Sequence, residues 1–510
     1  MNLLGVLLTL VAMQLPPVAP PADVPEPTAA PFRVVPADDP AVPRPSLPYL
    51  RTIVETSFVL GLGTVWYWRA PSASDFDLHF DKRDWRSKLF SVNDVVFDDN
   101  RFSTNGIVHP VAGAIYYQIA RGNGLGPGAS FASSFLASAV WEYFTEFREK
   151  PSINDLILTP MGGAVIGEAT YRVGRMFAAG RPSVPNCIGA MVFSLVATLN
   201  ETTVCRSASH PPYDDLGFSQ STPHRLDLAV GESFGRFDDG PLSGDLLIDF
   251  AAVVVTNPGY ERPGQETLPV HAGQWTSFIL EGLLSDGNLT GFWMHADMAW
   301  WGRYSRHFAE PSGERGERAS GRGLMLALGS TFDYDTRDLP TEKDRTATAG
   351  ILGPRMEYTS RRGRVSWRAE VGAEYGFSIV TSLVYPFAGP ALAGQEIKSE
   401  LWQQGYYYAQ SLVAHAAFQA RLGFVELSLA ARLLDAWSFN RGDRYQSQIT
   451  NNFSLFDQRT WIRTAVTLPI FGGPLNAMLM AERDDRSSRI PGFSVHSVET
   501  RGALSILARF

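Results

Sequence analysis

Apolar and polar residues alternate along the C-terminal part of the chain, from about residue 223 onward, and no other feature limits the fold as strongly. The pattern is clear in 424–434, 365–377 and 501–510, where apolar side chains recur at every second position. Successive side chains of a β-strand point to opposite faces, so this period predicts strands with one apolar and one polar face. Residues 223–510 are therefore predicted to form a β-structure.

Three features favour a closed transmembrane barrel over a two-sheet sandwich, which would alternate in the same way. The candidate strands run for about 10–15 residues, against about 5–6 in soluble sheets. The chain stops on Phe510 at the end of a strand, which resembles the terminal aromatic residue of bacterial outer-membrane barrels. Aromatic residues also gather at strand ends, namely Trp300, Trp301, Tyr304, Tyr406, Tyr407, Tyr408, Trp437 and Phe439.

The predicted fold class is α+β, with an N-terminal helical domain followed by an antiparallel transmembrane β-barrel of about 12 strands. The candidate strands are 223–232, 246–257, 275–285, 289–304, 323–335, 349–360, 364–380, 405–420, 424–439, 460–470, 475–486 and 496–510. Charged residues of both signs would face the lumen, namely Glu370, Glu374, Glu426, Arg432, Arg368, Arg463, Glu499 and Arg501. Mixed signs favour either a wet pore or an ion-paired plug.

The composition excludes several classes of protein. Of 510 residues 19% are charged, and the formal net charge of −8 argues against a nucleic-acid partner. The two cysteines, Cys187 and Cys205, allow one disulfide at most and exclude a disulfide scaffold or a Cys-based zinc protein. The mean hydropathy of −0.07 is too low for a bundle of membrane-spanning helices but does not exclude a barrel.

The N-terminus has the pattern of an exported protein. Residues 1–20 begin with an apolar run that has the length of a signal-peptide core and is too short to span a bilayer. Residues 21–48 are rich in proline and are predicted to be an extended linker. These segments indicate export to the bacterial periplasm or beyond.

Residues 49–200 are predicted to form a helical domain. Its candidate helices, separated by Gly and Pro signals, are 49–68, 103–121, 129–147, 153–176 and 187–199. Gly, Pro or charge interrupts each one early, so we expect a compact domain with one side that could face lipid, rather than a bundle of spans. Gly163 and Gly167 would let another helix approach closely.

A dense motif occupies residues 97–168. It contains the stretches HP-x-x-G-x-x-YY-x-x-AR, WEY-x-x-E and EKPSINDL-x-x-TP-x-GG-x-x-GE. Its residues are His109, Pro110, Gly113, Tyr116, Tyr117, Ala120, Arg121, Trp141, Glu142, Tyr143, Glu146, the run 149–156, Thr159, Pro160, Gly162, Gly163, Gly167 and Glu168. This segment resembles the bacterial family called domain of unknown function 3943, and the resemblance implies no reaction, cofactor or ligand.

The same motif supplies the candidate site residues His109, Glu142, Glu146 and Asp155. Glu142 and Glu146 lie one turn apart on an aromatic-rich helix, and Asp155 takes the capping position of the helix that Ser152 starts. Carboxylates one turn apart repel each other, so we expect a cation beside them. The candidate cations are Arg121, Lys150 and His109, and antiparallel packing of the two helices favours Lys150 and His109.

Three interpretations of this cluster stay open. It could be a buried ion-pair network that locks three helices together. It could be a catalytic His–carboxylate pair acting on a lipid or cell-wall substrate. His109, Glu142 and Glu146 could also bind a metal, although one His among oxygen ligands is a weak signal. We expect no cofactor, since no P-loop, G-x-S-x-G or H-E-x-x-H motif occurs.

We expect an outer-membrane protein of a Gram-negative bacterium, with its helical domain in the periplasm or partly in the barrel mouth. The expected role is that of a pore, a lipid-handling protein or a structural envelope protein, and the alternative is an envelope enzyme acting through the His–carboxylate cluster. The expected partners are outer-membrane lipids and the barrel-assembly machinery, which would recognise Phe510. Another envelope protein or a small solute stays open as a further partner.

Overall fold

The computed structural model of the chain describes residues 47–69, 88–90, 95–147, 149–200, 213–214, 217–219, 222–310, 319–339, 343–388, 399–439, 454–470 and 474–510. The predicted signal peptide and residues 21–46 of the predicted linker lie outside these ranges, as does Cys205. Cys187 is disulfide-bonded.

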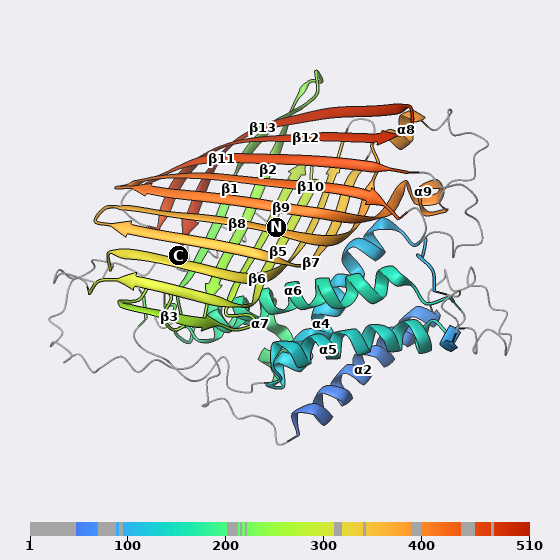
Figure 1. Cartoon of the computed structure of the whole chain (residues 1–510), viewed down its shortest axis with the longest axis horizontal. Coiled ribbons are helices and arrows are strands. Elements are labelled where there is room, and N and C mark those ends of the chain that lie inside the picture. The colour runs from blue at the N-terminus through green and yellow to red at the C-terminus, as the bar shows by residue number, and fades with distance from the viewer. Residues whose placement is uncertain are drawn as a thin grey trace.

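The prediction of an antiparallel 12-strand barrel is confirmed within the described ranges (Figure 1). The ring closes because β13 pairs with β1 and β5 pairs with β6. The barrel strands are β1 (His224–Phe237), β2 (Leu242–Val255), β4 (Trp275–Ser285), β5 (Asn288–Phe308), β6 (Gly321–Asp338), β7 (Lys343–Arg362), β8 (Val365–Thr381), β9 (Tyr406–Leu422), β10 (Val425–Ser438), β11 (Phe456–Pro469), β12 (Leu475–Ile490) and β13 (Phe493–Arg509).

The alternation in the sequence separates the lumen from the outer wall. On β13, Leu504 and Ile506 are 62% and 58% exposed on the outside, whereas Ser505 between them is buried. Phe510 exchanges two backbone hydrogen bonds with Leu226 of β1, at N···O distances of 2.8 and 2.9 Å. The last residue of the chain therefore takes part in closing the ring.

One strand was not predicted. β3 (Gly264–Val270) lies within a segment that the sequence analysis treated as a connection, and it pairs with the last residues of β5, Gly302–Phe308. β3 and β4 follow each other along the same side of β5. β3 is short and contains Pro269, which carries no amide hydrogen, so its alternation signal is weak.

The helices match the predicted segments closely. They are α2 (Pro48–Arg69), α4 (His109–Gly122), α5 (Pro127–Val140), α6 (Ile153–Ala178) and α7 (Val184–Asn200), with short α8 (Val384–Ala388) and α9 (Ser399–Gln404) between barrel strands. Two π-helical turns, η3 (Thr104–Val108) and η4 (Trp141–Thr145), precede α4 and follow α5. Ser152 caps α6 as predicted, because its Oγ accepts a hydrogen bond from the amide of Asp155. None of the helices in the described ranges is long and apolar enough to cross a membrane.

The helical domain packs against the outer wall of the barrel. α6 contacts β2, β4, β5, β6 and β7, and Figure 1 shows the blue and cyan helices beside the barrel, with α2 farthest from it. The contacted wall includes a row of outward residues, each the register partner of the next, namely Phe250, Leu280, Met294, Tyr334, Ala347, Ile379 and Tyr408. The expectation of a helical domain in the barrel mouth is therefore wrong.

A single apolar core joins the two parts of the molecule. Leu158 and Val165 of α6 belong to the same buried cluster as Met294 of β5 and Phe332 of β6. The outward side of these strands is apolar because a barrel wall normally faces lipid, and an apolar helix satisfies that face equally well. A strand whose outward face meets lipid therefore has the same alternating sequence pattern as a strand whose outward face meets a helix.

Glycine lets α4 and α6 cross in contact. A Cβ atom added to Gly163 would lie 2.5 Å from the carbonyl carbon of Gly113, and one added to Gly113 would overlap the Thr159 oxygen. Tyr117 packs in the same way on Gly167. The predicted role of Gly163 and Gly167 in close helix approach is confirmed.

Gly163→Ala is expected to push α4 and α6 apart and to destabilise the helical domain by about 1–3 kcal/mol, the usual cost of overpacking. The control is Gly61→Ala in α2, where an added Cβ meets open space. That change should be neutral or slightly stabilising, because Ala favours a helix more than Gly. Urea titration of the helical ellipticity in detergent measures both, and equal midpoints for the two variants would contradict the close crossing.

Candidate functional site

Three of the predicted site residues meet where α4, η4 and α6 converge. Asp155 lies in the first turn of α6, and its Oδ2 is 3.6 Å from Nε2 of His109. The Asp155 side chain also hydrogen-bonds that of Glu142. Glu142 lies in η4 and accepts a 2.7 Å hydrogen bond from the amide of Ser152, while His109 directly follows η3. Short π-helical turns of this kind occur often at functional sites.

Glu146 lies beside this group, with a different set of neighbours. Its Oε1 accepts a 2.9 Å hydrogen bond from the indole of Trp141. The buried Lys88 donates to the backbone oxygens of Glu146 and Glu149, at 2.5 and 2.6 Å. The sequence analysis did not find Lys88, since it lies outside the motif and carries no spacing signal.

Asparagine and tyrosine side chains link the cluster to the barrel wall. Asn154 donates to Asp155 Oδ1 at 2.8 Å and to Asp98 Oδ1 at 3.2 Å. Tyr408 of β9 donates to the same Asp98 oxygen at 3.0 Å, and Asn105 donates to the Tyr408 hydroxyl at 2.7 Å. A continuous polar chain therefore joins a barrel strand to Asp155.

This link corrects the interpretation of one aromatic group at a strand end. Tyr406 and Tyr408 point at the helical domain, where the Tyr406 hydroxyl donates to the Asn100 oxygen at 2.6 Å. Tyr407, between them, faces the lumen and donates to Asp457 at 2.8 Å. All three tyrosines are fully buried, so they do not form a belt at a lipid boundary.

Burial controls the protonation of the cluster. It raises the pKa of Glu142 and of Asp155 well above the usual range, and neighbouring carboxyl groups add to the effect. Burial, followed by the charges of Glu149 and Asp155, raises the pKa of Glu146 from 4.5 to about 8. Burial also lowers the pKa of His109, so that the ring is neutral at pH 7. The cluster at neutral pH is a set of carboxylic acids beside a neutral imidazole.

Of the expected cation partners, Arg121 lies away from the cluster, whereas His109 lies beside it. Arg121 pairs with Glu168 at 2.7 Å, and Arg172 and Tyr117 bind the same carboxylate at 2.7 and 2.9 Å. Burial alone would raise the pKa of Glu168, but the two arginines lower it. Arg121 stands in the last turn of α4, at the far end from His109, and therefore cannot reach the η4 end of the antiparallel helix.

Several buried atoms of the cluster make no hydrogen bond to the protein while both carboxyl groups are ionised. In the described part of the chain they include Nε2 of His109, Oε1 of Glu142 and Oδ2 of Asp155. A proton on one of the two carboxyl groups supplies the hydrogen bond between Glu142 and Asp155. A neutral imidazole beside such a pair can exchange a proton with a bound molecule. Glu142 and Asp155 are each 1% exposed, and His109 is partly exposed although its Nε2 is buried.

A metal ion does not suit this cluster as it stands. Among the described residues, three His, Asp or Glu ligand atoms come within 4.8 Å of one another only at Asp297, Glu370 and His415 in the barrel lumen. Arg355 already occupies that group, with its guanidinium 3.0 Å from His415 Nε2 and 3.7 Å from Glu370. Its positive charge takes the place that a metal would need.

The class that the fold defines is a closed antiparallel β-barrel with an attached helical domain. Residues 94–197 match the family model described as domain of unknown function (DUF3943), which confirms the resemblance found in the motif and extends it through most of α7. No curated protein matches the sequence.

Solved structures similar to this chain are bacterial outer-membrane barrels. The in-vitro folded outer membrane protein OmpT of Vibrio cholerae is 6% identical, with 57% of this chain and 97% of that chain covered and a TM-score of 0.21. The translocator domain of the autotransporter NalP from Neisseria meningitidis is 10% identical, with coverage of 56% and 88% and a TM-score of 0.20. The outer membrane channel DcaP of Acinetobacter baumannii is 9% identical, with coverage of 57% and 97% and a TM-score of 0.20.

Raising the pH from about 4.5 to about 8 is expected to destabilise the helical domain, because folding raises the pKa of Glu146 across this window. The folded state keeps a proton that the unfolded chain releases, so the stabilisation is complete below pH 4.5 and is lost as the pH rises to about 8. Glu146→Gln retains an acceptor for Trp141 and cannot ionise. Its urea midpoint should therefore fall less between pH 5 and pH 8.5 than that of the wild type.

The control for this measurement is Glu168→Gln. It leaves Arg121 and Arg172 without their buried carboxylate, and breaking such a buried pair costs about 3–5 kcal/mol. This loss of unfolding free energy should be present at both pH 5 and pH 8.5. A pH dependence of Glu146→Gln equal to that of the wild type would contradict the raised pKa of Glu146.

Proposed function

We propose that this protein resides in the outer membrane and handles lipid there, with its helical domain lying beside the barrel in contact with the lipid layer. The observation that carries the proposal is the position of that domain on the outward wall of the barrel, from β2 to β9. A domain that serves passage through a lumen would be expected in the lumen or at its mouth. A domain on the outer wall is in a position to meet lipid.

The surface of the helices supports a lipid neighbour. Large apolar side chains are exposed on the faces turned away from the barrel, including Phe58, Leu62, Trp66, Leu136, Phe144, Val192 and Leu199. The uncovered barrel wall carries residues of the same kind, including Leu412, Leu429, Leu479, Leu504 and Ile506. Apolar surfaces of this extent on a folded protein indicate a membrane or a protein partner, and the continuity with the barrel wall favours lipid.

The contents of the lumen argue against a wide pore. Arg463 of β11 reaches Glu482 at 2.6 Å and Glu281 of β4, on another part of the wall, at 2.5 Å. Arg486 joins Asp344 at 2.7 Å and Glu499 at 3.1 Å. Ion pairs that cross the interior narrow the lumen and argue against an open, wet pore. Insertion by the barrel-assembly machinery is part of the proposal.

Nitroxide labels on the helices test the lipid contact in the reconstituted full chain. Cysteines replacing Leu136 of α5 and Val192 of α7, which are 62% and 69% exposed, carry the labels. Both labels should be more accessible to dissolved oxygen, which concentrates in lipid, than to a water-soluble nickel complex. A label at the exposed Glu310, just after β5, is the control and should show the reverse. Nickel-dominated relaxation at Leu136 and Val192 would place the domain in water and end the proposal.

A second candidate function is that of an envelope enzyme acting on a lipid through His109, Glu142 and Asp155. The observation that favours it is the buried Glu142–Asp155 carboxyl pair next to a neutral imidazole. In this function His109 would exchange a proton with the substrate, and Asp155 would hold the ring. The alternative, a purely structural cluster, predicts loss of protein rather than loss of activity.

Asp155→Asn separates these two functions, because it keeps the shape of the side chain and removes its acidity. If the cluster is catalytic, the variant should accumulate normally and yet give the same envelope lipid composition as a deletion strain, measured by mass spectrometry. Asp435→Asn, on the outer face of β10, is the control and should leave both unchanged. Lower protein levels for Asp155→Asn, or unchanged lipids at normal levels, would exclude catalysis by the cluster.

A further inference from the structure

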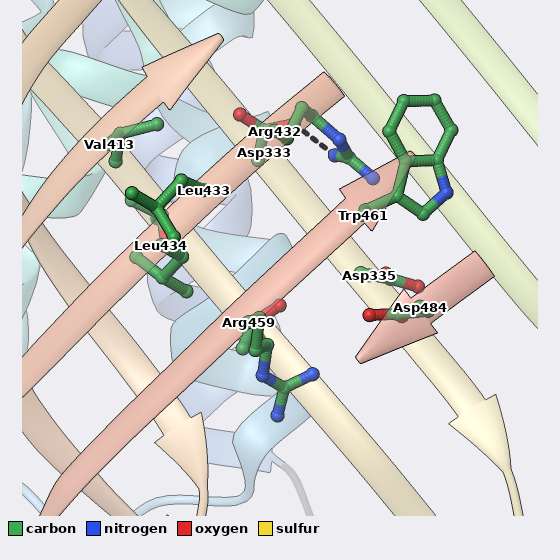
Figure 2. Close-up of a pocket in the computed structure, with 11 residues that line it drawn as sticks. Asp333, Asp335, Val413, Arg432, Leu433, Leu434, Arg459, Trp461 and Asp484 are labelled. Atoms are coloured by element: carbon green, nitrogen blue, oxygen red, sulfur yellow. Dashed lines mark hydrogen bonds and ion pairs between the residues drawn. The ribbon is translucent and has the colours of Figure 1, made fainter. Parts of the chain in front are cut away.

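Two of the cavities lined by described residues lie in the barrel lumen and share a partition. The small chamber has a volume of about 50 Å³ and the large chamber about 180 Å³. Arg432 and Trp461 line both of them, so these two side chains separate one chamber from the other. Figure 2 shows the small chamber, with Arg432 bonded to Asp333 beside Trp461.

The partition is built from opposite walls of the barrel. Trp293 stands on β5 and Trp461 on β11, and six steps around the ring separate these strands in either direction. The two indole rings nevertheless meet, with their centroids 5.6 Å apart. Contact between residues on opposite walls means that the two indoles bridge the lumen at this level.

Arginine holds the two indoles together. The Arg432 guanidinium lies 4.2 Å from the Trp293 ring centroid and 4.5 Å from that of Trp461. Asp333 fixes Arg432 at 2.8 Å and is itself bound by His295 at 3.0 Å. Cation–π contacts of this kind are stronger where the charged group is removed from water, and the Arg432 side chain is only 19% exposed. The side chains alone make the closure, so rotation of an indole would open it without a change in the strands.

The large chamber has the character of a binding site for a small polar molecule. Its charged groups are balanced within the wall, since Asp297 pairs with Arg355 and Glu370 lies 3.3 Å from Arg368. Such a wall offers aromatic faces and hydrogen-bonding groups without a net charge that would select an ion. An engineered cavity of about 150 Å³ in another protein holds benzene, so the chamber suits a molecule of similar size.

We propose that the lumen is a two-chamber path for small uncharged or zwitterionic solutes, closed between the chambers by the Trp293–Trp461 contact and by Arg432, which packs against both rings. The large chamber binds the solute, and movement of the aromatic partition admits it to the small chamber. This activity is separate from the proposed action of the helical domain on lipid. The solute path requires only that the barrel is inserted in a membrane.

Swelling of vesicles that contain the full-length protein tests the path, with glycerol as the uncharged probe and glycine as the zwitterionic probe. Trp461→Ala removes one half of the partition and should accelerate swelling several-fold over the wild type with both probes. The matched control is Trp367→Ala, which removes an exposed indole from the outer wall of β8 and should leave the swelling rate unchanged.

Heat-modifiable migration shows whether each variant forms a closed barrel. Arg432→Gln is the second variant, since it removes the guanidinium while His295 still pairs with Asp333. Folded Trp461→Ala or Arg432→Gln that swells no faster than the wild type would overturn the path. Faster swelling of Trp367→Ala as well would also overturn it, because the effect would then come from a damaged barrel. The nitroxide accessibility of the helices stays an independent measurement of the lipid contact.

Discussion

The packing of α6 on the outward wall of the barrel is the contact on which the rest of the structure depends. It covers apolar side chains such as Met294 and Phe332 that would otherwise meet lipid. It also sets the position of α4 and α5, because α4 crosses α6 at Gly113 and Gly163. The candidate cluster is assembled at the start of α6 only after these helices are in place. One apolar interface therefore organises both the domain and its polar centre.

The molecule buries carboxyl groups in two different ways. Glu168 in the helical domain and Glu482 in the lumen each pair with arginine, and the opposite charges stabilise each other. At Glu142, Asp155 and Glu146 burial dominates, and the raised pKa values keep these groups protonated near neutral pH. Carboxylic acids kept neutral by burial can donate hydrogen bonds and exchange protons, which paired carboxylates cannot do. This difference distinguishes the candidate site from the structural ion pairs around it.

The exposed helix surface and the barrel lumen differ in polarity. The exposed helix faces continue the apolar wall of the barrel, while the lumen is polar and divided by the Trp293–Trp461 contact. Tyr408 and Asn105 connect the wall with the candidate cluster through direct hydrogen bonds. A displacement of β9 would therefore be felt at Asp98 and, through Asn154, at Asp155.

The sequence by itself determined the strands, their two faces, the helices and the glycine crossing, because these follow from local periodicity and from backbone space. The twelve barrel strands, the Ser152 cap and the close approach at Gly163 were all predictable for this reason. Only the tertiary structure decided what each face contacts. An outward Phe332 carries the same signal whether lipid or α6 covers it, and Arg121 carries no mark of its partner Glu168, 47 residues away. Ion pairs and interfaces between distant segments depend on how whole elements pack. A local sequence pattern does not show which distant segments come together.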